Sequence, residues 1–389
     1  MKLSSINFHN ILTSIRFLLV IPYALLRRKG HPNVWIISER PDQACDNGLV
    51  FFRYVRKNHP SQEIYYLIEM GSSDERKVKQ FGSVIHFNSW KHFYYYCLSR
   101  IHISSHVNGC VPQDAPIARR LKKLLDVKDV FIPHGVSYGI SEFCLEKYAR
   151  LDLFVCSGRP EYDNVLQNYG YTKQQVVYTG FPRLDEWHLI DVKKNQILVM
   201  PTWRMYLAQK PDTIIEETDY YKRYQDLLNN RRLRDFIESN NLMLIFYLHD
   251  NMKKYRGSFY SHSSHIVVAN NSDVDIQSLL KESALLVTDY SSVHFDFAYM
   301  EKPVIYYQFD KDEFQKKQYM SSGYSYENDG FGPIANELDQ LVEHIMKMHD
   351  SGFRLQGKYV ENMKRFYLVR DNNNSERVYK EIHKHFGRG

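Results

Sequence analysis

Residues 285–296 read LLVTDYSSVHFD, and this stretch decides the fold class of the chain. Three apolar residues, 285–287, predict a buried strand, and the polar segment 288–292 that follows predicts a turn leading into a helix. A strand that passes directly into a helix is the building block of a parallel sheet with right-handed crossovers. The stretch therefore predicts an α/β protein.

The same alternation of short apolar runs and helical patterns extends along the chain in both directions. The predicted strands lie at residues 34–37, 64–68, 84–87, 101–103, 130–132 and 153–156, and then at 197–200, 243–247, 265–268, 285–287 and 304–307. A length of 389 residues exceeds the size at which one hydrophobic core usually stops growing. We expect two doubly wound, Rossmann-like domains facing each other across a cleft, the GT-B arrangement.

A change of pattern near residue 190 marks the expected domain boundary. Gly180 and Pro182 break the periodicity, and the charged stretch 191–194 is unsuited to burial. We predict an N-terminal α/β domain at residues 31–190 and a C-terminal α/β domain at residues 191–389. The last helix is free to cross back to the first domain.

The first segment, residues 1–30, predicts an amphipathic helix. Apolar residues at Phe8, Ile11, Leu12, Ile15, Leu18 and Leu19 follow the spacing of one helical face. The densest apolar run, 17–26, is shorter than the roughly 20 residues that span a bilayer, and the positive charges follow it, unlike those of a signal peptide. Two readings carry equal weight: a peripheral helix on the cytoplasmic face of the membrane, with Arg27, Arg28 and Lys29 against anionic headgroups, or a helix packed on the first domain.

Charge and cysteine usage narrow the class of partner. The formal net charge of +6 is mild, which fits anionic small molecules or a membrane surface better than nucleic acid. The five cysteines are odd in number and far apart, so neither a disulfide framework nor a zinc site is indicated. A reducing cytoplasmic compartment fits best, and the oligomeric state is left open.

Polar residues directly after predicted strands are the site candidates, because ligands of open α/β sheets gather beyond the carboxyl ends of the strands. In the first domain this rule selects His134, which Gly135 would leave projecting from a tight turn, as a general base. In the second domain it selects His249, a catalytic candidate suited to holding a phosphate.

Two further segments of the second domain follow strands. Pro201 and Thr202 lead to Arg204, whose guanidinium suits bidentate contact with phosphate. The other segment offers an anion site at a helix N-terminus through Thr288, Asp289, Ser291 and Ser292.

Each candidate also has a plain structural interpretation. A histidine after a strand is often only a hydrogen-bonding residue, hydroxyl residues before a helix are usually N-caps, and Arg204 could form an ordinary ion pair. The pair Asp273 and Asp275 is assigned to capping, so no metal-binding residues are predicted, and Mg²⁺ accompanying a pyrophosphate is left open. Taken together, two imidazoles, a guanidinium and a helix N-terminus supply a base and charge stabilisation for a reaction at a pyrophosphate.

Several stretches resemble one family, the CDP-glycerol:poly(glycerophosphate) glycerophosphotransferases of teichoic-acid and capsule-polymer synthesis, over most of the chain. The matching stretches are IPHG at 132–135, GFPRLD at 180–185, MPTWR at 200–204, LHD at 248–250, VTDYSSV at 287–293 with FD at 295–296, and KPV at 302–304.

The resemblance implies a GT-B fold, a donor such as CDP-glycerol or another CDP-alditol, and release of CMP as a hydroxyl attacks the β-phosphorus. It implies His134 as the base, and His249, Ser291 and Ser292 as donor phosphate ligands, with weaker transfers to Arg204 and Asp289. The acceptor would be a lipid-linked or polymeric surface glycan on the side of the N-terminal domain, 31–190, and the C-terminal domain, 191–389, would bind the donor. The enzyme would associate with the membrane surface.

The sequence departs from the family pattern after both histidines. The usual Thr-Pro after His-Gly is replaced by Val136 and Ser137, and the usual Pro after the second histidine is Asp250. Donor recognition is therefore a firmer prediction than acceptor identity. The alternative functions left open are a GT-B glycosyltransferase that uses a nucleotide sugar in cell-surface polysaccharide synthesis and a membrane-bound binding module without turnover.

Overall fold

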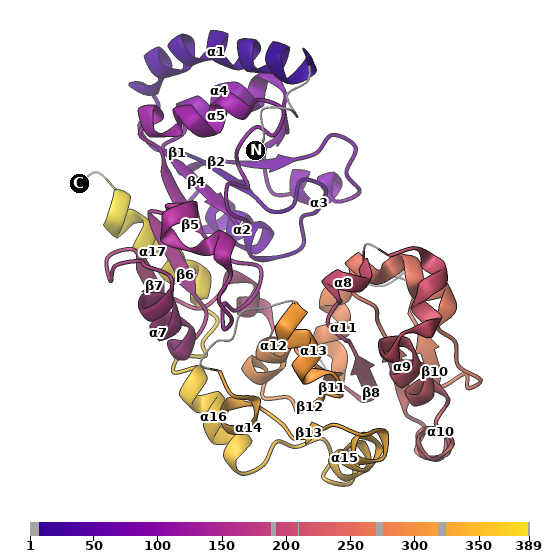
Figure 1. Ribbon diagram of the computed structural model, residues 1–389. Helices are drawn as coiled ribbons and strands as arrows, with labels where there is room; N and C mark the ends of the chain where they lie inside the picture. Colours follow the sequence, from indigo (N-terminus) through magenta and orange to yellow (C-terminus); the bar gives the residue numbers. More distant parts are fainter. Residues whose placement is uncertain (1–7, 188–191, 209, 270–274, 318–323, 388–389) are drawn as a thin grey trace. The chain divides into compact units, whose positions relative to one another are not determined.

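A computed structural model of the chain describes residues 8–187, 192–208, 210–269, 275–317 and 324–387. The chain forms two compact units, each built on one parallel sheet (Figure 1). Unit 1 comprises Met1–Ser137, Glu142–Asp185 and Asp371–Gly389, and unit 2 comprises Tyr138–Ser141 and Glu186–Arg370. The predicted boundary at residue 190 falls within 188–191, which lie outside the described residues.

The sheet of unit 1 has the strand order β3-β2-β1-β4-β5-β6-β7, and all neighbouring strands are parallel. The order reverses between β1 and β4, where Ser38 pairs with Ser104. Its strands are β1 (Val34–Ser38), β2 (Glu63–Ile68), β3 (Val84–His86), β4 (Ile101–Ser104), β5 (Lys128–Phe131), β6 (Leu153–Cys156) and β7 (Val176–Tyr178).

Helices cover both faces of this sheet, because successive strand residues point to opposite sides. On one face Trp35 stacks on Phe51 of α2 and contacts Tyr379 of α17, while on the other Ile36 packs in a cluster with Phe17 and Phe93 of α1 and α4. The helices of unit 1 are α1 (Phe8–Arg28), α2 (Asn47–Asn58), α3 (Glu75–Lys79), α4 (Trp90–Leu98), α5 (Pro116–Leu121), α6 (Glu146–Ala149), α7 (Arg159–Asn168) and α17 (Asn374–Phe386). Helix α17 belongs to unit 1 although it follows unit 2 in the sequence.

The sheet of unit 2 has the strand order β10-β9-β8-β11-β12-β13, again entirely parallel. Its order reverses between β8 and β11. Its strands are β8 (Lys193–Val199), β9 (Met243–Phe246), β10 (Ile266–Val268), β11 (Ser283–Thr288), β12 (Val304–Tyr307) and β13 (Ile334–Ala335).

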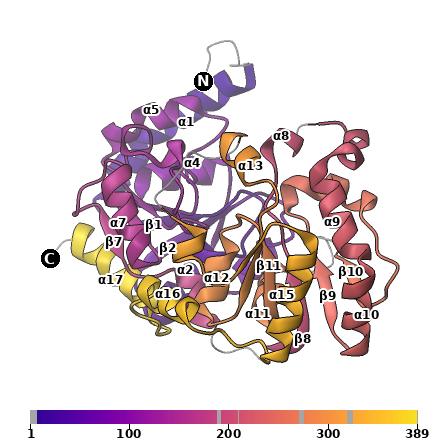
Figure 2. The same ribbon diagram turned by 60° about the horizontal axis from the view of Figure 1, so that its bottom comes forward.

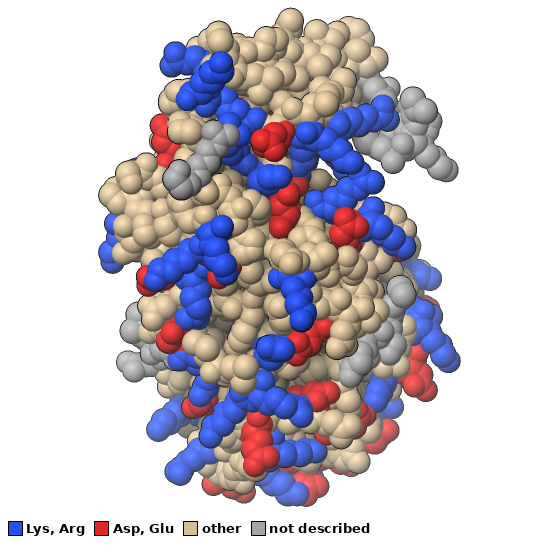
Figure 3. Space-filling view, turned by 90° about the vertical axis from the view of Figure 1, so that its left-hand side faces the viewer, with Lys and Arg blue, Asp and Glu red and all other residues tan. Residues whose placement is uncertain are grey.

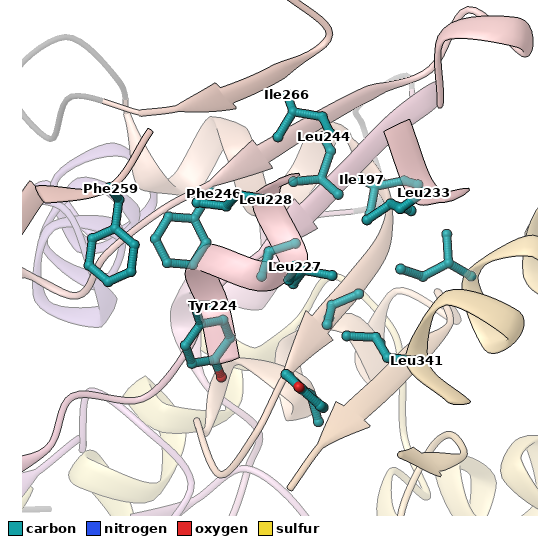
Figure 4. Packing of buried hydrophobic residues seen from close by; sticks show 14 of the residues in the cluster. Ile197, Tyr224, Leu227, Leu228, Leu233, Leu244, Phe246, Phe259, Ile266 and Leu341 are labelled. Atoms are coloured by element: carbon teal, nitrogen blue, oxygen red, sulfur yellow. The ribbon is translucent and has the colours of Figure 1, made fainter. Parts of the chain in front are cut away.

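One face of this sheet carries the core of unit 2 under α9, α10 and α15 (Figures 2 and 4). Strand residues such as Ile197, Leu244 and Phe246 pack there against Leu227 of α9 and Leu341 of α15. The helices of unit 2 are α8 (Met205–Ala208), α9 (Asp219–Asn229), α10 (Arg231–Ser239), α11 (Ile276–Glu282), α12 (Val293–Tyr299), α13 (Lys311–Lys317), α14 (Tyr326–Asp329), α15 (Leu338–Asp350) and α16 (Lys358–Phe366).

All strands predicted from the sequence are present, and the two doubly wound layers confirm the predicted fold class. The sequence prediction missed β7 and β13, which are three and two residues long. Alternation needs at least four residues to be recognised, so strands this short are predicted only from their apolar character, which identified β3 and β10 but not β7 and β13.

Helix α1 extends well beyond the apolar run 17–26, which is itself too short to span a bilayer. It runs for 21 residues through Pro22 and is long and apolar enough to cross a membrane by length and composition, which alone is weak evidence for a span. One stripe of the helix, including Phe17, Ala24 and Arg28, is buried against unit 1. The Arg28 guanidinium donates to the carbonyls of Leu98 and Ser99, so Arg28 does not face outward as predicted, whereas Arg27 and Lys29 are exposed.

Candidate functional site

In unit 2 the candidate residues follow four strands that are neighbours in the sheet, β9, β8, β11 and β12. His249 comes after β9, Arg204 after β8, the Asp289 to Ser292 segment after β11, and Asp310 after β12. Because the strands are parallel, these loops share one edge of the sheet, and the reversal between β8 and β11 lies at its middle. A reversal of this kind is where open α/β sheets bind ligands.

Asp289 joins the loops after β8 and β11. One carboxylate oxygen, Oδ1, accepts hydrogen bonds from the backbone N–H of Thr202 at 2.7 Å and of Tyr290 at 2.6 Å. The other, Oδ2, accepts from Nη2 of Arg204 at 2.8 Å. Asp289 is fully buried, so its carboxylate acts on the two loops and is not presented to a ligand.

Arg204 is fully buried as well, and its donors are occupied. Nε lies 2.8 Å from Asp310, Nη1 donates to the Thr202 carbonyl at 2.7 Å, and Nη2 is shared by Asp289 and Asp310. Burial disfavours the charge of Arg204, but the two carboxylates outweigh burial and raise its pKa well above the usual value. This geometry does not fit the predicted direct contact of Arg204 with phosphate and fits a positioning role.

Thr288 is also a positioning residue. Its side chain is buried, and its hydroxyl donates to the carbonyl of Met200 at 2.7 Å. Gln308, after β12, donates to the carbonyl of Asp289 at 2.9 Å. The sequence reasoning missed Gln308 and Asp310, although the rule that selects residues after strands would have found both.

Ser291 and Ser292 present the hydroxyls of this edge. Both residues are half-buried, and within the described part of the chain neither hydroxyl has a hydrogen-bond partner. Ser292 occupies the N-cap position of α12, yet its side chain makes no cap hydrogen bond. The common structural explanation of such a serine, a cap, therefore does not account for its hydroxyl.

His249 lies at the N-cap of the 3₁₀ segment Asp250–Ser258, and a backbone N–H of that segment orients its ring. Its Nδ1 accepts a hydrogen bond from the Asn251 N–H at 3.1 Å. A neutral imidazole that accepts at Nδ1 carries its proton on Nε2, which is then a donor. The indole of Trp203 lies nearly parallel to the His249 ring, with ring centroids 6.1 Å apart.

In unit 1 the predicted base, His134, follows β5 and is exposed. Its ring stacks on that of His106, which follows β4, with centroids 4.9 Å apart and an interplanar angle of 5°. The carbonyl of His134 accepts from Nη1 of Arg183 at 2.6 Å. Asn47 holds the same loop, because its amide donates to the Pro133 carbonyl at 2.7 Å and accepts from the Arg183 N–H at 3.1 Å.

Both imidazoles favour the neutral form. Desolvation by the surrounding protein lowers the pKa of His106 to about 4 and lowers that of His134 below 6.5. A hydrogen bond with the Ser105 backbone opposes the shift of His134. Because a backbone carbonyl only accepts, one nitrogen of His134 carries the proton there and the other has a free lone pair. His134 is thus in the form that a general base needs.

His106, Arg183 and Asn47 were not identified as site residues from the sequence. His106 follows a predicted strand and was open to the same rule that selected His134. Asn47 lies in the first turn of α2, far from His134 in the sequence, and only the folded chain brings it to the loop. Among the described residues no group of three or more His, Cys, Asp or Glu side chains is arranged to hold a metal ion.

The fold defines the class first: two parallel α/β units of this kind are found in GT-B transferases and nucleotide-sugar epimerases. The solved structure of the wall teichoic acid polymerase TagF has a TM-score of 0.66 at 15% identity, covering 97% of this chain and 98% of the other. A UDP-N-acetylglucosamine 2-epimerase has a TM-score of 0.55 at 11% identity over 91% of this chain and 96% of its own.

The sequence then identifies the family. The profile of the CDP-Glycerol:Poly(glycerophosphate) glycerophosphotransferases matches residues 20–384, and the chain belongs to this family. The minor teichoic acid biosynthesis protein GgaB of Bacillus subtilis (strain 168) is 31% identical over 361 residues, 90% of this chain and 39% of GgaB. The teichoic acid poly(glycerol phosphate) polymerase of the same strain is 21% identical over 87% of this chain and 47% of its own length. The chain thus spans less than half of the length of each of these two relatives.

Proposed function

We propose that this chain transfers glycerol phosphate, or a related alditol phosphate, from a CDP-linked donor to a lipid-linked or polymeric surface-glycan acceptor and releases CMP. The observation that carries the proposal is the set of hydroxyl and imidazole side chains at the strand reversal of unit 2, in a member of this family. Ser291 and Ser292 have unpartnered hydroxyls within the described part of the chain, and the Asn251 N–H orients the nearby His249 ring through Nδ1.

The relatives support the choice of substrates. Their names refer to poly(glycerol phosphate) and poly(ribitol-phosphate) polymerases. One solved structure is a histidine variant of TagF whose crystal was soaked with a compound denoted CDPG. Glycerol and ribitol donors are therefore the first to test.

In this reaction the acceptor hydroxyl attacks the β-phosphorus of the donor. The new P–O bond forms as the bond to the CMP oxygen breaks, and CMP leaves with the electron pair of that bond. His134 takes the proton of the attacking hydroxyl on its free nitrogen. His249, Ser291 and Ser292 donate hydrogen bonds to the phosphate oxygens, whose charge grows as the leaving group departs.

The remaining predicted residues act through these groups. Asp289 fixes the loop that presents Ser291, and Arg204 neutralises the buried carboxylate of Asp289. Pro201 and Thr202 belong to the second loop that Asp289 holds. Gly135, next to His134, is assigned a structural role at the base.

The test is a donor panel with the full-length chain and a glycerol-phosphate-primed acceptor. CDP-glycerol, CDP-ribitol and UDP-sugars are supplied separately, and release of CMP or UDP is followed with time, with and without EDTA. We expect CMP release that depends on acceptor. Release of UDP from a UDP-sugar with no CMP from either CDP-alditol would instead establish the glycosyltransferase alternative.

We further propose that α1 places the enzyme on the cytoplasmic face of the membrane as a peripheral protein. The outward face of α1 is apolar, with Phe8, Leu19 and Leu26 exposed by 81%, 67% and 72%. Figure 3 shows a surface with few charged side chains at the end of unit 1 that α1 covers, bordered by Lys and Arg side chains. An apolar helical face beside basic residues suits the interface of an anionic bilayer.

A further inference from the structure

The strand reversal of unit 1, between β1 and β4, is flanked by two residues to which no role has been given. Arg40 comes two positions after the last residue of β1, and His106 comes two positions after the last residue of β4. Ser38 and Ser104 pair in register, so both residues leave the same edge of the sheet side by side. His134 follows β5, the next strand along, and its ring stacks on His106.

Arg40 brings a positive charge to this edge of the sheet. It is half-buried, and within the described part of the chain its guanidinium forms neither an ion pair nor a hydrogen bond. The pairing of Ser38 with Ser104 places it beside His106, and its charge contributes to lowering the pKa of His106 and of His134. A partly desolvated guanidinium without a carboxylate partner is suited to an anionic ligand.

The acidic residues nearby form hydrogen bonds with groups other than Arg40. The carboxylate of Asp46 accepts from Nη1 of Arg183 at 2.7 Å. Glu39 is buried, with its carboxylate turned to the backbone N–H groups of Cys45 and Leu49, and burial raises its pKa to about 7. With these groups accounted for, the edge retains a positive charge at Arg40.

His106 supplies hydrogen-bonding capacity and not charge. Its Nδ1 lies 3.0 Å from the hydroxyl of Ser105, which can donate to it. In that tautomer Nε2–H is a donor. A neutral donor and a guanidinium on either side of a strand reversal, next to the proposed base, match the single negative charge and the acceptor oxygens of a phosphodiester.

We propose that Arg40 and His106 bind a phosphodiester of the acceptor, adjacent to the hydroxyl that His134 deprotonates. This inference rests on the proposed function for the identity of the acceptor. It adds one chemical property of that acceptor: the hydroxyl that reacts belongs to a unit already linked through phosphate. The phosphate comes from the end of a growing polymer or from a lipid-linked primer.

The experiment measures binding and turnover with the full-length chain. Isothermal titration with bis(glycero)phosphate as the soluble phosphodiester and glycerol as the neutral control is run on the wild type, Arg40→Gln, His106→Phe and Arg76→Gln. The His106→Phe variant retains an aromatic ring to stack on His134 but lacks the donor. Arg76→Gln is the matched control, because Arg76 is exposed on α3 and its loss removes the same charge from unit 1.

We expect the Kd of bis(glycero)phosphate to rise by about tenfold or more in Arg40→Gln and by a smaller factor in His106→Phe, with Arg76→Gln unchanged. The KM for a phosphodiester acceptor should rise in parallel, whereas the KM for the donor should not. Equal Kd and KM values in the wild type and Arg40→Gln would overturn the inference.

Two further arms separate the sources of phosphate and the two proposals. A dependence on Arg40 with bis(glycero)phosphate supports a polymer end, and a dependence seen only with phosphatidylglycerol vesicles, compared with phosphatidylcholine vesicles, supports a lipid-linked phosphate. Binding that depends on Arg40 in a chain that turns over no CDP-alditol would sink the proposed function and leave the subsite standing.

Discussion

Nη2 of Arg204 lies 2.8 Å from Oδ2 of Asp289, and both side chains are completely buried. The pair connects the loops after β8 and β11 at the strand reversal of unit 2, and Asp310 adds a second carboxylate to the same guanidinium. A buried ion pair of this kind contributes little over an apolar substitute of the same shape, but removal of one partner leaves an uncompensated charge.

Arg204→Met should therefore destabilise unit 2 severely. Two carboxylates would remain buried without their guanidinium, a change that typically costs about 3–5 kcal/mol of unfolding free energy. The midpoint of urea unfolding, followed by tryptophan fluorescence, reports the loss. Arg231→Met serves as the control, because the Arg231 side chain is 88% exposed, and it should shift the midpoint very little. If both variants unfold at the same urea concentration, the guanidinium has no structural role.

Substitution of His249 should act on the donor and not on the fold. His249→Ala removes the Nε2–H donor, and a hydrogen bond to a charged group contributes about 1.5–3 kcal/mol, so kcat/KM for CDP-glycerol should fall by roughly tenfold to a hundredfold. His249→Gln keeps a donor near the same place and should recover part of the loss. Identical kcat/KM values for wild type and His249→Ala would remove His249 from the donor site.

The activity of the wild type should follow the protonation of His134. A base acts when neutral, and the pKa of His134 is lowered below 6.5 by desolvation, so kcat/KM should be flat above pH 6.5 and decline as the pH falls through the lowered pKa. His134→Ala should lose about 10²- to 10⁴-fold in rate. Arg40→Gln removes a charge that lowers this pKa and should move the acid limb to higher pH. An acid limb that stays in place in Arg40→Gln contradicts this electrostatic coupling.

Glu161 predicts a pH dependence of stability in unit 1. It is 1% exposed, its carboxylate accepts from the backbone N–H groups of Ser137 at 2.6 Å and Ser157 at 2.5 Å, and burial raises its pKa from 4.5 to about 7. A carboxyl group whose pKa is raised on folding stabilises the folded state fully at a pH below its pKa in the unfolded chain. This contribution is lost as the pH rises through its pKa in the folded chain. The contribution of Glu161 to the free energy of unfolding therefore disappears between pH 4.5 and pH 7. It amounts to about 3 kcal/mol.

Glu161→Gln should flatten that window. The amide retains an acceptor oxygen but does not ionise, so the difference in unfolding free energy between variant and wild type should change by about 3 kcal/mol between pH 4.5 and pH 7.5. Denaturant titrations at a series of pH values give this difference directly. A difference that is constant with pH would show that Glu161 keeps its ordinary pKa.

The sequence predicted the layers of this fold well because each strand is a short apolar run bounded by turn residues. It also placed His134, His249 and Ser291 directly after strands, where the structure has them. That these residues carry the chemistry stays a prediction. The sequence could not distinguish residues that contact a ligand from residues that only position others. Arg204 and Ser292 both follow strands in the sequence. In the structure the Arg204 guanidinium is enclosed by Asp289 and Asp310, whereas the Ser292 hydroxyl lacks a described partner. Burial and pairing depend on residues far apart in the chain, which no local pattern records.

The last prediction concerns α1, and the structure changes how it is tested. Deletion of residues 1–30 would remove Phe17 and Arg28, which are buried against unit 1, and would expose its core. Replacement of Phe8, Leu19 and Leu26 by serine alters only the outward face. Full burial of one such side chain contributes about 1.5–3 kcal/mol, so even partial insertion of three should make vesicle binding more than tenfold weaker in the variant.

Cosedimentation with vesicles of phosphatidylglycerol and phosphatidylcholine measures this binding. The matched control replaces three exposed apolar residues away from α1, Met70, Leu368 and Val369, by serine. Because both triple variants remove comparable apolar surface, a general effect on solubility would change them alike, whereas a membrane-binding face on α1 predicts loss of binding in the first variant alone. Unchanged sedimentation of the α1 variant would leave α1 as a helix that only packs on unit 1.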